Sequence, residues 1–282
     1  MLRERALGAA IVVLPLVVVV AIGGLAITLF IGVVVALGAY EVFRLLRSAG
    51  YPTQPWLGLV YAVVVALAIA IAFESATFPR LAGSSLLLAS VGLILVAVDA
   101  FTRPDPRDGL AAWMTTTFGA LYIAQLAFVV RLGQVAPAVA PDAPAAMLGS
   151  ERTWIILLVL GVWAYDTGAF LVGRRFGKAR FLAHISPSKT YAGLVGGLVA
   201  CTAVVAIGLW ATGQPVVHAL ALGPLLGLAA QAGDLAESML KRAAGAKDSS
   251  SLIPGHGGVL DRVDSFLFAA PIVTLYVIAL LA

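Results

Sequence analysis

Residues 191–212 read YAGLVGGLVACTAVVAIGLWAT, a stretch without a single charged side chain. A helix rises about 1.5 Å per residue, so a run of this length crosses the roughly 30 Å of hydrocarbon in a bilayer. Gly213, Gln214 and Pro215 follow directly, and these residue types favour a turn. The stretch therefore predicts a membrane-spanning helix, in which Cys201, the only cysteine of the chain, is expected to pack as an apolar residue.

Comparable apolar runs recur along all 282 residues. The composition is 61% hydrophobic and 11% charged, whereas soluble domains are roughly 45–50% apolar and about 25% charged. We therefore predict an all-α, polytopic integral membrane protein with about nine transmembrane helices. The predicted spans are residues 6–22, 25–44, 56–73, 82–100, 110–131, 153–173, 191–212, 216–240 and 262–281. Residues 1–282 are interpreted as one membrane domain, in which 1–150 hold helices one to five with a linker and 151–282 hold helices six to nine with basic loops.

The distribution of Lys and Arg predicts the orientation, because positive loops are retained in the cytoplasm. With a cytoplasmic N-terminus, all of the 18 Lys and Arg except Arg80, Arg131 and Arg152 fall on the cytoplasmic side. The two most basic loops, residues 174–190 and 241–261, then face the side where nucleotides are available. We expect a multi-pass protein of the cell (inner) membrane, surrounded by membrane lipids and with a cytoplasmic active site. No nucleic-acid partner is expected.

Five acidic residues fall within the predicted spans, where an ionisable group costs at least a few kcal/mol and suggests function. They are Glu41, Asp99, Asp166, Asp234 and Glu237. Glu41 and Asp99 lie near predicted helix ends, where a wet interface accommodates them without a special role. The other three are harder to explain in this way.

A polar stripe is predicted at the end of the eighth helix. Asp234, Glu237, Ser238 and Lys241 follow the spacing i, i+3, i+4 and i+7, which places them on one helix face. One interpretation is a self-neutralising ladder that holds a helix bundle together. The other is a binding site near the cytoplasm.

The segment 247–264, KDSSSLIPGHGGVLDRVD, favours the binding site. The glycines around His256 free the backbone for close approach to a ligand, and amides in such a loop can cradle phosphate oxygens. Asp261 and Asp264 are three residues apart at the start of the last predicted helix, so both carboxylates can face one point. Carboxylates beside Lys and Arg are the usual way to hold Mg²⁺.

From Ser238 to Asp264 the sequence resembles the signature of the phosphatidate cytidylyltransferase (CDP-diacylglycerol synthase) family. The pattern is S-x-L-K-R, then K-D four residues later, then P-x-H-G-G-x-x-D-R-x-D. Residues 166–190 are similar to a second block of that family, although Ser188 and Ala192 stand where Lys and Glu are common. The effect of these two departures stays open. The resemblance covers the second half of the chain.

The resemblance implies transfer of a cytidylyl group from CTP to phosphatidic acid, with release of pyrophosphate and dependence on Mg²⁺, for phospholipid synthesis. The residues expected to act in catalysis are Asp234, Lys241, Asp261, Arg262 and Asp264. The expected Mg²⁺ ligands are Asp234 and Asp261, supported by Asp166 and Asp264. The expected substrate-binding residues are Arg174, Lys189, Ser238, Arg242, Lys247, Asp248, His256, Gly257 and Gly258. A second metal ion and a homodimer stay open.

Two other functions compete with this interpretation. A related CTP-dependent enzyme would act on another membrane lipid, such as an ether phospholipid or a prenyl alcohol. An ion-coupled transporter would also carry acids within its helices, but we find no internal symmetry of the kind that transporters have. A purely structural membrane protein would have no use for glycine-rich basic loops beside paired carboxylates.

Overall fold

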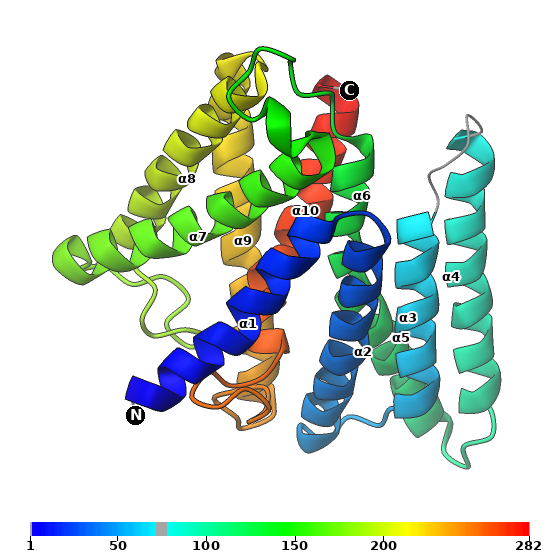
Figure 1. Cartoon of the computed structure of the whole chain (residues 1–282). Coiled ribbons are helices and arrows are strands. Elements are labelled where there is room, and N and C mark those ends of the chain that lie inside the picture. Colours follow the sequence, from blue (N-terminus) through cyan, green and yellow to red (C-terminus); the bar gives the residue numbers. More distant parts are fainter. Residues whose placement is uncertain (1, 72–77, 282) are drawn as a thin grey trace. The chain divides into compact units, whose positions relative to one another are not determined.

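The chain folds into helices joined by loops, and a computed structural model describes its residues 2–71 and 78–281 (Figure 1). Side chains are described from residue 10 onward, except those of residues 12, 71 and 78–85. The side chain of Arg80 and the end of the predicted span 56–73 therefore lie outside the description. The elements are α1 (Leu2–Ile22), α2 (Leu25–Ser48), α3 (Pro55–Ile71), α4 (Phe78–Ala100), α5 (Pro106–Ala124), η1 (Gln125–Ala127), α6 (Phe128–Val135), η2 (Ala146–Leu148), α7 (Ser150–Phe176), α8 (Tyr191–Thr212), η3 (Val216–His218), α9 (Ala219–Ala243) and α10 (Leu260–Leu280).

The all-α membrane fold is confirmed, and each predicted span corresponds to a helix. Within the described residues, six helices are long and apolar enough to cross a membrane, and three shorter apolar helices accompany them. The described part of the chain contains no strand, only two isolated β-bridges in loops. The predicted span 110–131 differs in one respect, because a 3₁₀ turn at Gln125–Ala127 divides it into α5 and α6.

The contacts group the chain into two compact units. The first unit contains Met1–Arg131 and Leu240–Val263, and the second contains Leu132–Met239 and Asp264–Ala282. Helices α9 and α10 each contribute residues to both units. This grouping differs from the division at residues 150 and 151, which stays a prediction.

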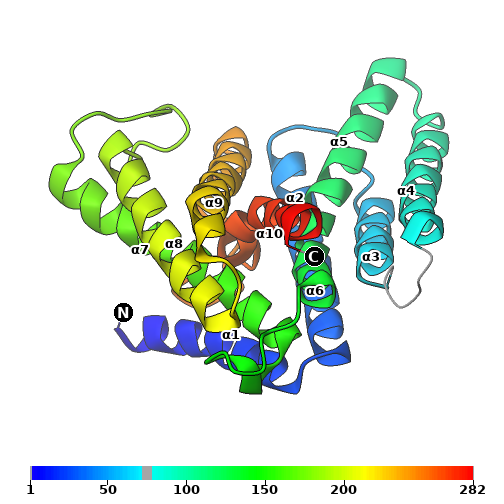
Figure 2. The same cartoon turned by 90° about the horizontal axis from the view of Figure 1, so that it is seen from above.

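The first unit is built around the packed helices α2, α3, α4 and α5, which lie side by side in both views (Figures 1 and 2). Close packing depends on glycine, because a Cβ at Gly58 or Gly119 would overlap the buried ring of Phe43. Helix α2 also carries Glu41, which is 0% exposed. Helix α2 therefore holds a carboxylate inside the first unit.

The second unit contains the helices α7 and α8, which pack extensively against each other. Small residues let the backbones approach, as is usual between membrane helices. A Cβ at Gly168 would meet the carbonyl of Gly196, and one at Gly173 would meet the backbone of Gly193. Helix α8 begins where the hydroxyl of Thr190 accepts a hydrogen bond from the Gly193 amide at 3.1 Å, which is an N-cap.

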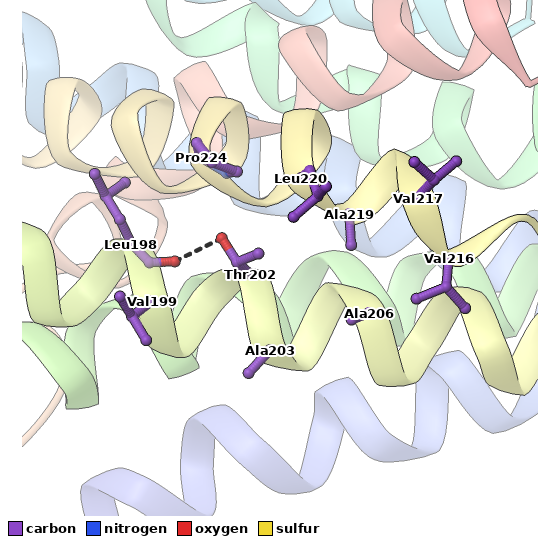
Figure 3. Close-up of a pocket in the computed structure, with 10 residues that line it drawn as sticks. All are labelled: Leu198, Val199, Thr202, Ala203, Ala206, Val216, Val217, Ala219, Leu220 and Pro224. Carbon is purple, nitrogen blue, oxygen red and sulfur yellow. Dashed lines mark hydrogen bonds between the residues drawn. The ribbon is translucent and has the colours of Figure 1, made fainter.

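An apolar groove of about 610 Å³ lies between α8 and the η3–α9 segment (Figure 3). None of its ten lining residues is charged. Its single hydroxyl, that of Thr202, donates to the carbonyl of Leu198 at 2.8 Å. The groove suits hydrocarbon and has no group that would bind a phosphate.

Candidate active site

Asp261, in the first turn of α10, is the centre of a hydrogen-bond cluster in the first unit. Its Oδ1 pairs with Lys241 Nζ at 2.7 Å, and the two side chains are only 6% and 13% exposed. Its Oδ2 accepts from the amides of Ser249 at 2.8 Å and Gly258 at 2.7 Å, and lies 2.8 Å from the Ser249 hydroxyl. Asp261 therefore fixes Lys241, whose ammonium donors bind anions, and also ties together the two ends of the signature loop, residues 244–259.

Glu41 of α2 lies beside this cluster in the same unit. Its carboxylate accepts from the amides of Val259 at 3.1 Å and Leu260 at 2.7 Å. The hydroxyls of Ser249 and Ser250 approach it at 3.0 Å and 2.5 Å. The sequence analysis offered an unremarkable interfacial role for Glu41, but the structure shows a buried carboxylate in contact with both ends of the signature loop.

The glycines of the loop serve this internal packing. Gly257 adopts a φ of 79°, which favours glycine, and a Cβ there would press on the Asp261 carboxylate. A Cβ on Gly258 would collide with the Ser249 hydroxyl and the Glu41 carboxylate. The backbone does make a close approach here, as the sequence predicted, but the groups it approaches belong to the protein.

Charged residues on the outside of the signature loop and its flanking helices are exposed. Arg242, Lys247 and Arg262 are exposed, as is Asp248, while His256 is half-buried. Arg242 donates to the carbonyl of Ala246 at 3.1 Å. Lys241 and the exposed Arg242, Lys247 and Arg262 give the first unit four cations with the chemistry to bind phosphate groups.

A second cluster lies in the second unit. Lys189 pairs with Oδ2 of Asp234, and the two side chains are 23% and 22% exposed. Asp166 interacts electrostatically with both residues. The Ser238 hydroxyl makes a long contact of 3.5 Å with Asp234 Oδ1, in keeping with the predicted polar face of α9.

Packing between α7 and α9 accounts for the proximity of Asp166 and Asp234. The Tyr165 hydroxyl donates to Oε1 of Gln231 at 2.8 Å. Tyr165 directly precedes Asp166 on α7, and Gln231 lies three residues before Asp234 on α9. Lys189 directly precedes Thr190, the N-cap of α8. Helix ends and buried contacts thus position each of the three charged residues.

Two further predicted residues, Arg174 and Asp264, belong to the second unit. Arg174 is exposed in the last turn of α7. Asp264 accepts from the Ser265 amide at 2.6 Å, and its backbone packs against α9, because a Cβ on Gly233 would overlap the Asp264 carbonyl. Asp264 is therefore packed beside the residue that precedes Asp234.

The sequence analysis missed two residues that contact the signature loop. Glu41 and Arg44 lie in α2, and Arg44 Nη2 donates to the Ser249 carbonyl at 2.8 Å. A charged residue inside an apolar run was the only signal for Glu41, and Arg44 entered only as a contribution to loop charge. Neither signal names a partner more than 200 residues away.

The carboxylates of both clusters have the donor chemistry for Mg²⁺, which takes oxygen ligands. Asp234 already holds a cation, the Lys189 ammonium. Within the described ranges, no three His, Cys, Asp or Glu side chains gather closely enough to hold a metal ion. This arrangement fits an ion bound by one or two carboxylates and completed by water and substrate phosphates, the usual mode for Mg²⁺.

Comparison with known proteins extends the resemblance to the N-terminal helices. The chain is 35% identical over 286 residues to the chloroplastic phosphatidate cytidylyltransferase 4 of Arabidopsis thaliana, covering 95% of this chain and 71% of that protein. It is 37% identical over 284 residues to the phosphatidate cytidylyltransferase of Pseudomonas aeruginosa, covering 96% and 95%. The Synechocystis enzyme of the same name is 45% identical over 128 residues, 45% of this chain and 43% of that protein. The cytidylyltransferase family matches residues 3–280, and the chain belongs to this family.

Proposed function

We propose that this protein transfers the cytidylyl group of CTP to phosphatidic acid, giving CDP-diacylglycerol and pyrophosphate. The observation that carries the proposal is the match to the Pseudomonas aeruginosa phosphatidate cytidylyltransferase over 95% of that protein. The Lys241–Asp261 pair, in which both residues belong to the signature, supports it locally.

The reaction requires no side chain to act as a base. A phosphate oxygen of phosphatidic acid attacks the α-phosphorus of CTP, and the bond from that phosphorus to the oxygen bridging to the β-phosphorus breaks. The second pKa of a phosphate monoester is about 6, so the attacking oxygen is already ionised near neutral pH. Catalysis then depends on orientation and on the neutralisation of two anionic substrates.

The first unit supplies cations for phosphate groups. Asp261 holds Lys241 in place, and Arg242, Lys247 and Arg262 are exposed. Arg presents a planar fork of donors that matches phosphate oxygens, while Lys acts as a point charge. We assign these four cations to the triphosphate and the departing pyrophosphate.

The second unit supplies carboxylates and a lysine. When bound, Mg²⁺ would neutralise part of the negative charge that develops on the leaving group. In this unit we assign Asp234 as the principal Mg²⁺ ligand, supported by Asp166 and Asp264. In the first unit, Asp261 stays a predicted Mg²⁺ ligand. Lys189 and Arg174 are assigned to the lipid phosphate or the nucleotide.

The protein acts in a membrane, and we assign its basic loops to the cytoplasmic side of the cell membrane. The support is the distribution of Lys and Arg among the loops. Phosphatidic acid then reaches the protein from within the bilayer, while CTP arrives from the aqueous side.

The test uses the full-length protein purified in detergent, with CTP labelled on its α-phosphate, phosphatidic acid and Mg²⁺. We expect label in CDP-diacylglycerol, and none in the Asp261→Asn variant. Asp99→Asn is the matched control, because Asp99 is an exposed acid of α4 and should keep full activity. Label in an ether phospholipid alone would replace phosphatidic acid as the substrate, and no label with any lipid would contradict the proposal.

A further inference from the structure

We infer that Glu41 and Arg44, here called the α2 clamp, are positioning residues that hold the signature loop (residues 244–259) in its working conformation. Both residues and the loop belong to the first unit. The inference rests on the proposed function only where activity is measured. Its structural part can be tested in the absence of any substrate.

The Glu41 carboxylate is surrounded by hydrogen-bond donors. Two amides and two hydroxyls approach it between 2.5 and 3.1 Å, and the side chain is fully buried. A carboxylate has about four acceptor sites, so these donors occupy its capacity. A buried carboxylate without such partners would be strongly destabilising, which indicates that Glu41 and the loop stabilise each other.

Glu41 also contacts the start of α10. The first amides of a helix have no partner within the helix, and a Ser, Thr, Asp or Asn at the preceding position usually accepts from one of them. Here that position is Val259, whose side chain accepts no hydrogen bond. Glu41 accepts from the amides of Val259 and Leu260 instead, and its charge is favoured at a helix N-terminus. A residue of α2 thus caps α10.

Both residues of the α2 clamp contact Ser249. Arg44 lies three residues after Glu41, so both side chains leave the same face of α2. Arg44 donates to the Ser249 carbonyl at 2.8 Å, while the Ser249 hydroxyl lies 3.0 Å from Glu41. The Ser249 amide donates to Asp261. All three polar groups of Ser249 are therefore engaged: the carbonyl by Arg44, the amide by Asp261, and the hydroxyl between Glu41 at 3.0 Å and Asp261 at 2.8 Å.

The clamp thereby acts on the residues assigned to phosphate binding. The amide and hydroxyl of Ser249 contact the Asp261 carboxylate, and Asp261 in turn binds the Lys241 ammonium at 2.7 Å. The clamp itself needs no contact with substrate. Loss of the clamp should loosen the loop and the Lys241–Asp261 pair while leaving the remaining helices of the unit packed.

A buried reporter in the loop measures this loosening directly. Ile253 is 8% exposed, and the only native cysteine, Cys201, is 0% exposed. In an Ile253→Cys protein, the rate of maleimide labelling reports how often the loop opens. We would compare Glu41→Gln, Glu41→Asp and Arg44→Gln in this background, with Asp99→Asn as the exposed-acid control.

We expect Glu41→Gln to raise the labelling rate about tenfold or more, because a hydrogen bond to a charged group contributes enough to change an equilibrium by that factor. Arg44→Gln should raise it less, about threefold to tenfold, and Asp99→Asn should leave it unchanged. Labelling within twofold of the parent protein in both Glu41→Gln and Arg44→Gln would overturn the inference. If Glu41→Gln does not fold, Arg44→Gln decides, because Arg44 is an exposed side chain.

Kinetics distinguish positioning from a general loss of structure. With Ile253 restored, Glu41→Gln should lower kcat/KM for CTP about tenfold or more, at an unchanged fraction of folded protein by gel filtration. Glu41→Asp keeps the charge and should recover part of that loss. A loss that matches only the fraction unfolded would overturn the positioning role. Faster labelling without activity toward any lipid in the parent would contradict the proposed function and leave the α2 clamp standing.

Discussion

Two aspartates, Asp261 of the first unit and Asp234 of the second, each hold a lysine but differ in their other partners. Asp261 accepts from two backbone amides as well as from Lys241. Asp234 is contacted by the side chains of Lys189 and Ser238. Side chains can rotate away from a carboxylate when a ligand arrives, whereas backbone amides leave only if the loop moves. The comparison shows that Asp261 has a structural role in the signature loop, and we propose that Asp234 is the more adaptable of the two predicted Mg²⁺ ligands.

The largest effect is expected from removal of Mg²⁺, which tests the proposal that Asp234 is a metal ligand. A chelator should abolish formation of CDP-diacylglycerol, and added Mg²⁺ should restore it. Asp234→Asn should raise the Mg²⁺ concentration for half-maximal activity by at least about 10- to 100-fold, which is the range for groups that only support a metal ligand. Titration of activity with Mg²⁺ measures both. An unchanged requirement in this variant would remove Asp234 from the metal site.

The next largest effect is a loss of stability in Asp261→Asn. The substitution removes the charge of Asp261 from its pair with the largely buried Lys241, and breaking a buried pair in this way should cost about 3–5 kcal/mol. Asp234→Asn breaks a more exposed pair and should cost about 1 kcal/mol or less. Thermal unfolding of both variants in the same detergent provides the measurement. Equal losses would break the comparison between the two aspartates.

A smaller effect is expected when the space around Asp261 is filled. In Gly258→Ala the new methyl group would collide with Ser249 and Glu41, so we expect a loss of about 1–3 kcal/mol, as overpacking usually gives. Gly32→Ala in α2 is the matched control, because a Cβ there meets nothing within 4 Å. That control should be neutral or stabilised by up to about 1 kcal/mol. Similar behaviour of the two variants would contradict the packing described for the loop.

The smallest effect concerns the placement of Lys189 in the second unit. Thr190→Ala removes the N-cap of α8 and should cost about 1 kcal/mol. Thr190→Ser keeps the hydroxyl and serves as the control. Because Lys189 directly precedes the cap, turnover should fall a few-fold in Thr190→Ala at saturating CTP. Unchanged turnover would show that Lys189 is positioned independently of the helix end.

Local sequence patterns predicted the helices well where both ends carry a signal. The span 191–212 agrees with α8 in both bounds, because Thr190 can cap its start and Gly213 adopts the left-handed conformation that ends it. The 3₁₀ turn at Gln125–Ala127 could not be predicted, since α and 3₁₀ segments bury the same kinds of residue. Hydrophobicity alone does not distinguish them.

The site was predictable in its residue types and less so in its partners. The signature identified Asp261 and Lys241, and helical spacing placed Ser238 near Asp234. The pairing of Lys189 with Asp234 joins residues on different elements, and no periodicity encodes such a contact. Glu41 illustrates the limit, because its position near a predicted helix end offered a sufficient local explanation while its partners lie 208 to 219 positions further along the chain.

That separation has a consequence for biosynthesis. The ribosome completes α2 early, so its carboxylate enters the membrane region long before the hydroxyls and amides that will satisfy it have been made. The contacting residues are separated by 208 to 219 positions along the sequence. Closing so long a loop has a high entropic cost, and contacts of this kind form late and slowly. We expect the nascent chain to keep Glu41 near water, or to provide it with temporary partners, until residues 249–260 have been made. The signature loop can therefore assemble on α2 only after more than 200 further residues have been added.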